Sequence, residues 1–592
     1  MLKTLGAQVK EYKTVSIMTP IVMIIEVIME MIIPLMMASI IDDGIEAGNI
    51  THVLIVGGLM VLAAIVGFSA GTLGGIFGAK ASTGFARNLR KAMYENIQTF
   101  AFSNIDKFST AGLVTRMTTD VTNLQNAYQM ILRMCFRAPF SIIIAMFMAF
   151  SISPRLASIY LIAVVVLSIV MIIIMATTMK YFSEVFKKYD DMNNSVKENV
   201  SAIRVVKAYV REEHEQKKFT TASGNIYKMF VKAESMIAKV SPVMNATVYI
   251  CILAISWVGA HMVVGSELTT GNLTSMLTYC MNILMNLMML SMIFVMVTMS
   301  MASARRICEV LEEKAEIVNP SGPVMEVNDG SIWFDHVNFA YTKDAKEYVL
   351  NDINLRIKSG ETIGIVGGTG SAKSSLVNLI SRLYDVSADG DVENGPTGAV
   401  YVGGVDVRDY DLETLRNEVA VVLQKNVLFS GTILENLRWG KKDATLEECK
   451  RACALACADE FIEQMPDKYE TYIEQGGTNV SGGQKQRLCI ARALLKQPKI
   501  LILDDSTSAV DTATDARIRK AFAEEIPNTT KLIIAQRISS VQNADRIIVM
   551  DNGRVNGFGT HEELLENNAI YRDVYESQTQ GNGDFDENGG EL

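Results

Sequence analysis

The first half of the chain is dominated by long, nearly uncharged apolar runs. Each run is close to the ~20 residues that an α-helix needs to cross a bilayer. The runs predict six membrane helices, at Ile17–Ile41, His52–Phe77, Ala138–Ile152, Leu156–Thr178, Val240–Val264 and Leu273–Met301. Because the number of crossings is even, both ends of the chain are expected on one side of the membrane.

Lys and Arg are distributed unevenly between the segments that connect these helices. The long stretches Lys80–Arg137 and Lys180–Lys239 hold many, whereas the three short connections hold only Arg155. Since positive loops stay on the cytosolic side, the pattern predicts a multi-pass protein of the cell (plasma or inner) membrane with both termini cytosolic. The short, basic N-terminus lacks a signal-peptide cleavage pattern and is predicted to be an uncleaved interfacial segment.

The long cytosolic stretches have helical periodicity of their own. Ala79–Phe102 and Phe182–Lys218 contain good helix formers and almost no Gly or Pro. We therefore expect the membrane helices to continue as rods about 35 Å beyond the bilayer, at ~1.5 Å per residue. Short tips around Ser109–Thr118 and Ile203–Glu213 would join the rods and suit mechanical coupling to a domain below.

Four charged residues lie within the predicted membrane helices. Glu26 and Glu30 are four residues apart on the first helix, and Arg133 and Arg137 are four apart where the third helix enters. Intramembrane charges either line a substrate cavity or pair with one another. Glu26 and Arg137 lie at comparable depth, so we favour an interhelical ion pair over a cation-attracting cavity.

Composition excludes some partners and chemistries. There are 55 Lys and Arg against 65 Asp and Glu, a net charge of −10, and no basic stripe, which argues against nucleic acid. The eight cysteines form no paired framework and are expected to be reduced. Cys449, Cys453 and Cys457 recur every fourth residue without nearby His and are interpreted as packing residues.

From about Ser331 the pattern changes to short β-rich runs alternating with helical ones, as in a parallel sheet flanked by helices. The fold class is therefore an α-helical membrane domain followed by an α/β domain. A buried strand leads into a Gly-rich turn and a helix, typical of a phosphate-binding loop whose backbone N–H groups hold phosphate. Lys373 would reach the β and γ phosphates, and Ser374 would bind Mg²⁺. The loop comprises Gly367, Gly368, Thr369, Gly370, Ser371, Ala372, Lys373, Ser374 and Ser375.

Position 372 departs from the strict loop motif, which has Gly where this chain has Ala372. The methyl group is harmless if the residue has negative φ, whereas a positive φ would strain the loop.

A second motif, "VSGGQKQR", narrows the interpretation. Gly482 and Gly483 begin a helix and leave N–H groups for a γ-phosphate, with Ser481 as a further donor and Gln484 following. With the phosphate loop and the stretch "ILILDDSTSAVD", the chain resembles the ATP-binding-cassette (ABC) ATPases. Six membrane helices followed by one cassette is the half-transporter layout of ABC exporters, so the resemblance covers nearly the whole chain.

The resemblance implies roles for matching residues. Tyr341 would stack on adenine, and Gln424 would touch Mg²⁺ and sense the membrane domain, with the coupling tips docking near it. Asp504 would hold the Mg²⁺ shell. The loop that links two ATP sites would comprise Ser508, Ala509, Val510 and Asp511. The implied cofactors are ATP and Mg²⁺.

Two positions depart from the family pattern in the same site. The family has Glu after the metal-binding Asp, and this chain has Asp505, whose carboxylate is drawn back by about 1 to 1.5 Å. The switch histidine of the family is replaced by Gln536, which cannot carry charge. Since general-base catalysis depends on hydrogen-bond reach, hydrolysis at this chain's own site is expected to be impaired.

In ABC dimers each ATP lies between the phosphate loop of one chain and the signature loop of the other. The pattern therefore resembles the degenerate-site subunit of heterodimeric bacterial multidrug-type exporters, which would move hydrophobic or amphipathic compounds such as drugs, lipids or peptides out of the cytosol. The alternatives are a slowly hydrolysing homodimeric exporter or lipid translocator, an importer on the exporter fold, and a nucleotide-gated regulator. The sequence identifies neither substrate nor partner.

The expected domain boundaries follow from these assignments. The transmembrane domain would span residues 1–305, a linker 306–330, the cassette 331–576 and an acidic, disordered tail 577–592. The acidic stretch 387–398 is interpreted as a surface-loop insertion.

Overall fold

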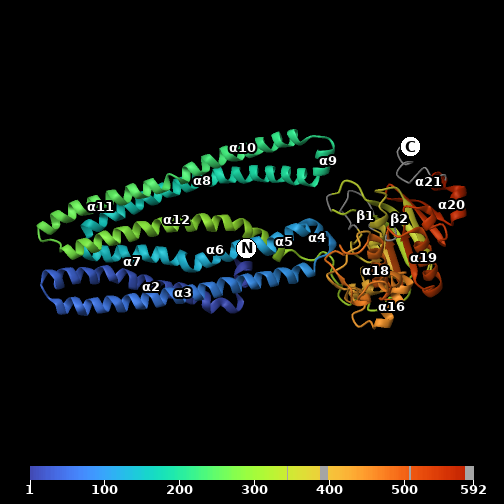
Figure 1. Ribbon diagram of the computed structural model, residues 1–592, viewed down its shortest axis with the longest axis horizontal. Helices are drawn as coiled ribbons and strands as arrows, with labels where there is room; N and C mark the ends of the chain where they lie inside the picture. The colour runs from blue at the N-terminus through green and yellow to red at the C-terminus, as the bar shows by residue number, and fades with distance from the viewer. Residues whose placement is uncertain (343–344, 387–397, 506–508, 580–592) are drawn as a thin grey trace. The chain divides into compact units, whose positions relative to one another are not determined.

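The computed structural model describes residues 1–342, 345–386, 398–505 and 509–579, so the stretch 387–397 and the tail 580–592 lie outside the described residues. The chain divides into two compact units (Figure 1). The first comprises Met1–Gln98 and Ser109–Glu313. The second comprises Thr99–Phe108 and Lys314–Leu592.

The first unit is helical. Within it, six helical stretches are long and apolar enough to cross a membrane, which confirms the predicted number. Their exposed faces carry large apolar side chains, as expected for surfaces that meet lipid. The helices are α1 (Leu2–Ala7), α2 (Lys13–Ser39), α3 (Ile50–Gln98), α5 (Thr110–Thr115), α6 (Val121–Met130), α7 (Phe136–Ile152), α8 (Pro154–Ser201), α9 (Ile203–Ala208), α10 (Glu212–Ile237), α11 (Val240–Val264) and α12 (Thr270–Glu312), with π-helical turns η2 (Ile40–Glu46), η3 (Arg116–Asp120) and η4 (Ile131–Cys135).

The expected rods are present in this unit. Helices α3 and α8 run for 49 and 48 residues without interruption, and α10 lies alongside α8 (Figure 1). The short helix α9 lies where the second tip was expected. At the first hairpin the separate short helix is α4 (Phe102–Phe108), which precedes the expected tip at Ser109–Thr118.

The second unit contains two larger sheets. One is antiparallel, in the order β2-β1-β4-β5, and the other has six strands in the order β12-β11-β3-β10-β9-β6. In the six-stranded sheet all pairings are parallel except that of the edge strand β12. The strands are β1 (Ile332–Phe339), β2 (Leu350–Ile357), β3 (Thr362–Gly367), β4 (Ala399–Val402), β5 (Val405–Asp406), β6 (Val419–Val422), β7 (Gly431–Thr432), β8 (Tyr472–Ile473), β9 (Ile500–Asp504), β10 (Thr530–Ile534), β11 (Arg546–Asp551) and β12 (Arg554–Gly559).

Both faces of the six-stranded sheet are buried. Along β9, Leu501 and Leu503 pack into one apolar core, whereas Ile500 and Ile502 pack into the other. This explains the uninterrupted apolar run of the strand, since a parallel sheet covered by helices has no solvent face. The helices of the unit are α13 (Lys373–Ile380), α14 (Leu412–Glu418), α15 (Ile433–Leu437), α16 (Leu446–Leu455), α17 (Asp459–Ile462), α18 (Gly482–Leu494), α19 (Thr512–Glu525), α20 (His561–Asn567) and α21 (Ala569–Thr579). Helix α21 thus extends three residues into the expected tail.

Helix α4 belongs to the second unit although it lies between membrane helices in sequence. The Asn104 amide donates to the carbonyl of Lys314 at 3.0 Å and accepts from the Glu316 N–H at 3.2 Å. The Tyr384 hydroxyl donates to the Asp106 carboxylate at 2.7 Å. Burial, followed by this hydrogen bond, raises the pKa of the Tyr384 phenol, so it remains a donor. Helix α4 is therefore bonded both to the linker and to the segment that follows α13.

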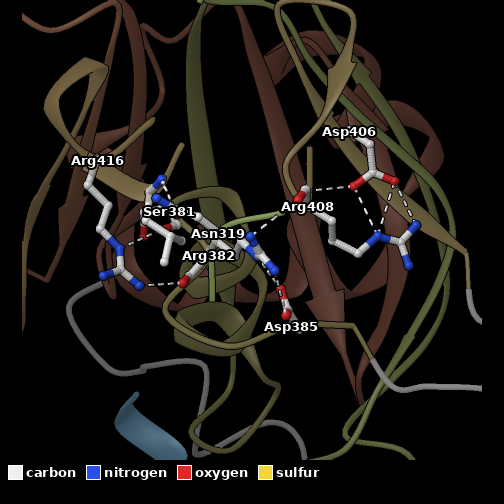
Figure 2. A network of polar contacts seen from close by, with 8 residues as sticks. Asn319, Ser381, Arg382, Asp385, Asp406, Arg408 and Arg416 are labelled. Carbon is white, nitrogen blue, oxygen red and sulfur yellow. Dashed lines mark hydrogen bonds and ion pairs between the residues drawn. The ribbon is translucent and has the colours of Figure 1, made fainter. Parts of the chain in front are cut away.

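The segment that carries Tyr384 is fixed by a polar network, shown in Figure 2. Arg382 is buried and has a φ of +50°. Its guanidinium donates to the Asp385 carboxylate at 2.8 Å and to the Arg408 carbonyl at 3.3 Å. Arg416 donates to the Arg382 carbonyl at 2.8 Å. These bonds hold the turn in its left-handed conformation and so set the direction of Tyr384.

The bond between Tyr384 and Asp106 can be tested by removing it. Tyr384→Phe removes only the hydroxyl and keeps the ring, so the packing is retained and the hydrogen bond is lost. Because such a bond contributes about 1 kcal/mol, the variant should loosen α4. Amide hydrogen exchange over Phe102–Phe108 should accelerate about fivefold. Asp106→Asn, which weakens the same bond, should give a change in the same direction, and unchanged exchange in both variants would contradict the assigned contact.

The phosphate-binding loop is strained at one residue. Ala372, at the N-terminus of α13, has φ +72° and ψ +24°, a left-handed conformation. An alanine pays roughly 1 to 2 kcal/mol there that a glycine avoids. The open question at position 372 is thus answered: the methyl group is not harmless.

Ala372→Gly should stabilise the second unit, by about 1 kcal/mol, because glycine adopts this conformation without steric cost. In thermal unfolding of the full chain this corresponds to roughly 2 to 4 °C. Ala454→Gly on the exposed side of α16 is the matched control, and it should lower stability by about 0.5 to 1 kcal/mol because a helical φ favours alanine. A destabilising Ala372→Gly would show that the methyl's packing outweighs the strain.

Candidate nucleotide site

The site is assembled at one edge of the six-stranded sheet. Strand β10 lies between β3 and β9 and pairs with both in parallel. The carboxyl ends of parallel strands meet at the same edge of a sheet. The phosphate loop after β3, Asp504 and Asp505 at the end of β9, and Gln536 just beyond β10 therefore converge, although more than a hundred residues separate the first from the second.

The phosphate loop supplies a cationic side chain and a hydroxyl. The Lys373 ammonium donates to the carbonyls of Gly367 and Gly368 at 2.8 and 2.7 Å and lies 3.4 Å from the Ser371 hydroxyl. The Ser374 hydroxyl donates to the Asp504 carboxylate at 3.0 Å. Thr369 and Gly370 lie in the turn between β3 and α13, and Ser375 in the first turn of α13. The helix N-terminus favours phosphate at this position.

Ser374 and Asp504 fit a Mg²⁺ site. Both offer the oxygen ligands that this ion prefers, and their oxygens are already adjacent. Asp504 is buried, and burial raises the pKa of its carboxyl despite the bond from Ser374 and the nearby Lys373. The Ser374 bond and the nearby Lys373 do not offset the cost of burying this negative charge, so a bound cation would stabilise the carboxylate. Ser374 and Asp504 would hold the ion, which would neutralise phosphate charge.

Asp505 and Gln536 contact each other. The Gln536 amide donates to the Asp505 carboxylate at 3.2 Å. Asp505 has a φ of +48°, and its N–H donates to the Ile534 carbonyl at 3.2 Å. A non-glycine residue in this region costs of order 1 to 3 kcal/mol and commonly marks functional sites. The two residues that depart from the family pattern thus form one unit at the mouth of the site.

Tyr341 lies beside the phosphate loop. Its ring is 44% exposed, and its hydroxyl is 2.7 Å from that of Ser375. It meets the Tyr384 ring edge to face, with centroids 5.0 Å apart. An accessible ring fixed in orientation next to the loop is suited to stacking on a base.

Gln424 is not brought into contact with the candidate metal ligands. It follows β6 and is exposed, and its side chain forms no hydrogen bond to Ser374 or Asp504 among the described residues. It lies beside a groove of about 350 Å³ lined by residues that include Leu423, Val427, Phe429 and Trp439.

The signature residues form a helix N-terminus. Ser481 caps α18: its hydroxyl accepts from the Gln484 N–H at 3.3 Å, and the Gln484 side chain accepts from the Ser481 N–H at 2.9 Å. A Cβ on Gly483 would lie 2.8 Å from the Ala509 carbonyl oxygen, which explains glycine there, and one on Gly482 would meet the Ala509 Cβ at 3.5 Å.

The loop after Asp505 is described only in part. Ser508 lies outside the described residues. The Ala509 N–H donates to the buried Gln486 side chain at 3.0 Å, Val510 packs on the neighbouring core, and Asp511 caps α19. The signature helix and this loop are therefore bonded to each other within one chain.

The intramembrane charges form an ion pair between helices. Arg137 donates to Glu30 at 2.8 Å and lies 3.8 Å from Glu26. Glycines on α3 make room for the charged side chains: a Cβ on Gly71 would lie 3.1 Å from the Glu26 carboxyl carbon, and one on Gly78 would lie 3.0 Å from Arg133. Small residues of this kind allow close helix packing in membranes. The ion pair is the arrangement favoured from the sequence.

Sequence reasoning missed three residues that support the site. Tyr384 and Asp106 connect α4 to the ring of Tyr341, and Gln578 on α21 contacts the backbone around Gln536. Tyr384 lies soon after the phosphate-loop helix, and this closeness in sequence is the signal that could have identified it. Nothing in one sequence brings Asp106 or Gln578 near the site, because their partners are distant in the chain.

Comparisons with known proteins agree with this architecture. The family model for the ABC transporter transmembrane region matches residues 16–311, and that for the ABC transporter matches residues 350–508. The chain is 35% identical to the Bacillus subtilis "Uncharacterized ABC transporter ATP-binding protein YfiB", over 96% of this chain and 97% of that protein. It is 31% identical to the "ATP-dependent lipid A-core flippase" of Desulfotalea psychrophila, over 83% and 84% of the two chains.

The fold also matches a solved structure, that of a bacterial Atm1-family ABC exporter with ATP bound. The TM-score is 0.79, at 23% identity, and the match covers 95% of this chain and 98% of the other. Family models for both regions, full-length relatives and the shared fold agree. The chain belongs to the ABC transporter family: it is a half-transporter that joins one transmembrane region to one ATP-binding domain, and it has the fold of an exporter.

Proposed function

We propose that this chain is the degenerate-site subunit of a heterodimeric, ATP-driven exporter, with its ATP-binding domain in the cytosol. It would move hydrophobic or amphipathic compounds out of the cytosol. Its own phosphate loop would bind Mg²⁺ and ATP at a slowly hydrolysing site, and its signature loop would complete a competent site with the phosphate loop of a different half-transporter.

The observation that carries the proposal is the bond between Gln536 and Asp505. A carboxylate one methylene shorter than glutamate, held in place by an amide, is poorly placed to polarise an attacking water. Misplacement of about 1 Å is sufficient to cost roughly 10²-fold in rate. The neutral Gln536 can donate a hydrogen bond to a γ-phosphate but cannot add positive charge, so the site is suited to retaining ATP.

The rest of the site supports retained nucleotide binding. Lys373 lies in the phosphate loop, and the Ser374 hydroxyl bonds the Asp504 carboxylate, which supports phosphate and Mg²⁺ binding at this site. Ser481 and the glycines that follow it form a regular capped helix N-terminus, the kind of helix end that favours phosphate. These contacts support nucleotide binding at both motifs. Of the three departures, Asp505 and Gln536 fall on hydrolytic positions, and Ala372 lies in the phosphate loop itself.

The groove beside Gln424 supports assembly with a second half-transporter. Leu423, Val427, Phe429 and Trp439 leave apolar surface exposed there, with Phe429 and Trp439 stacked at 4.1 Å. In the first unit, α9 and the residues after it expose Val205, Tyr209 and Val210. We assign the groove to the corresponding tip helix of the partner, and this chain's α9 to the partner's groove.

A second candidate is a slowly hydrolysing homodimeric lipid translocator. It is favoured by the similarity to a protein named as a lipid A-core flippase. A homodimer would carry two sites with Asp505 and Gln536, whereas a heterodimer would carry one. The two candidates therefore differ in the activity of the chain by itself.

The purified chain alone should hydrolyse ATP about 10²-fold more slowly than the complex formed with its cognate half-transporter. The measurement is ATP turnover in vesicles, with the partner sought first in the adjacent reading frame. Equal turnover of the chain alone and of the pair would sink the heterodimer proposal and favour the homodimeric translocator.

Restoring the family residues should raise ATP turnover of the purified chain by itself, where no faster partner site masks the change. Asp505→Glu combined with Gln536→His extends the carboxylate and supplies an imidazole, so this site should hydrolyse ATP about tenfold or more faster. Adding Lys373→Ala is the control, because it removes the phosphate contact and should abolish the gain. If turnover is unchanged, the weakness does not lie in Asp505 and Gln536.

A further inference from the structure

Helix α21, the last helix among the described residues, is hydrogen-bonded to the loop that carries Gln536. The Ile538 N–H donates to the Gln578 side-chain oxygen at 2.9 Å, and the Gln578 side-chain nitrogen donates to the Gln536 carbonyl at 3.0 Å. One amide therefore bonds the backbone on both sides of Arg537. We call the residues from Ala535 to Ile538 the switch segment.

The two elements joined by Gln578, helix α21 and the switch segment, are both anchored by buried side chains. Helix α21 is anchored by Tyr571, which is fully buried and whose hydroxyl is 2.7 Å from His561 Nδ1, and by the buried Val574. At the other end, the Ile538 side chain is 1% exposed. Gln536 itself is exposed, and its side chain reaches Asp505. Gln578 thus bonds the carbonyl of the residue whose side chain faces the nucleotide site.

A second element holds the residues just beyond. Arg519 on α19 donates to the Ser539 and Ser540 carbonyls at 3.1 and 2.6 Å, and pairs with Asp515 at 3.0 Å. These bonds fix the turn after the switch segment. They do not touch Gln536. The Ala535 N–H donates to the Ile365 carbonyl at 3.1 Å and the Ser540 N–H to the Arg537 carbonyl at 3.1 Å, so both flanks of Gln536 are fixed, and Gln578 bonds the Gln536 carbonyl between them.

We propose that Gln578 is a positioning residue that holds the switch segment so that Gln536 can meet the γ-phosphate. This inference rests on the proposed role of Gln536. A side-chain amide is well suited to the task because it donates and accepts at once, as a neighbouring backbone would. Loss of Gln578 frees the Gln536 peptide to rotate, so the contact with a γ-phosphate forms less often.

The experiment compares ATP with ADP, since only ATP carries the γ-phosphate. Fluorescent ATP and ADP analogues are titrated onto the purified full-length chain and onto Gln536→Ala, Gln578→Leu and the double variant. The ratio of ATP to ADP affinity should fall about tenfold for Gln536→Ala and about threefold for Gln578→Leu. The double variant should match Gln536→Ala alone, because both substitutions act on one contact.

Thr579→Val is the matched control. Its hydroxyl donates to the Tyr575 carbonyl within α21, so the affinity ratio should not change. Thermal unfolding of each variant distinguishes positioning from simple destabilisation, and Gln578→Leu should unfold within about 2 °C of the wild type.

The outcomes separate the inference from the function on which it rests. If Gln536→Ala lowers the ratio and Gln578→Leu does not, or if Gln578→Leu weakens ATP and ADP equally, the inference is wrong and the proposed role of Gln536 stands. If Gln536→Ala leaves the ratio unchanged, the role of Gln536 is wrong and the inference fails with it. Additive effects in the double variant would show that Gln578 does not act through Gln536.

Discussion

The parallel pairing of β10 with both β3 and β9 is the constraint on which the nucleotide site depends. It brings three strand ends, distant in sequence, to one edge of the sheet in fixed register. The place of Lys373, Asp504 and Gln536 in the site then follows from the position of each residue after the end of its own strand. A one-residue slip of any strand would move its apolar residues between the two cores and its polar residue out of the site. The packing of the sheet on both faces therefore also secures the chemistry.

Two residues with strained backbone lie at this edge of the sheet, in the candidate nucleotide site. Ala372 and Asp505 both adopt left-handed backbone conformations that cost free energy for residues with a Cβ. Both are positions at which the chain departs from its family's residues. The second unit tolerates them because the surrounding helices and strands are densely packed, with two extensive apolar cores. The left-handed backbone at Asp505 thus occurs in the same residue whose carboxylate is bonded to Gln536.

The site is also connected outward along two routes. Through Tyr341 and Tyr384 it reaches Asp106 on α4, a helix inserted between membrane segments of the chain. Through Gln536 it reaches Gln578 on the last helix. In the membrane, the glycines of α3 accommodate Glu26 and Arg133 where larger residues would clash. In each case a polar group contacts an element far away in sequence.

The sequence by itself determined the six helices able to cross a membrane, the long helical rods that extend them, the α/β class of the second unit and the residues of its motifs. These follow from local patterns: hydrophobic length, the helical period, and glycine or polar residues at the end of an apolar strand. It also favoured an interhelical ion pair, with Glu26 and Arg137 at comparable depth, whereas the shorter contact of Arg137 in the structure is to Glu30. The tertiary structure decided the sign of φ at Ala372, the bond between Asp505 and Gln536, the seating of α4 against Tyr384, and the grip of Gln578. The last three depend on contacts between residues tens to hundreds of positions apart, and the pattern of one sequence contains no signal for such pairings.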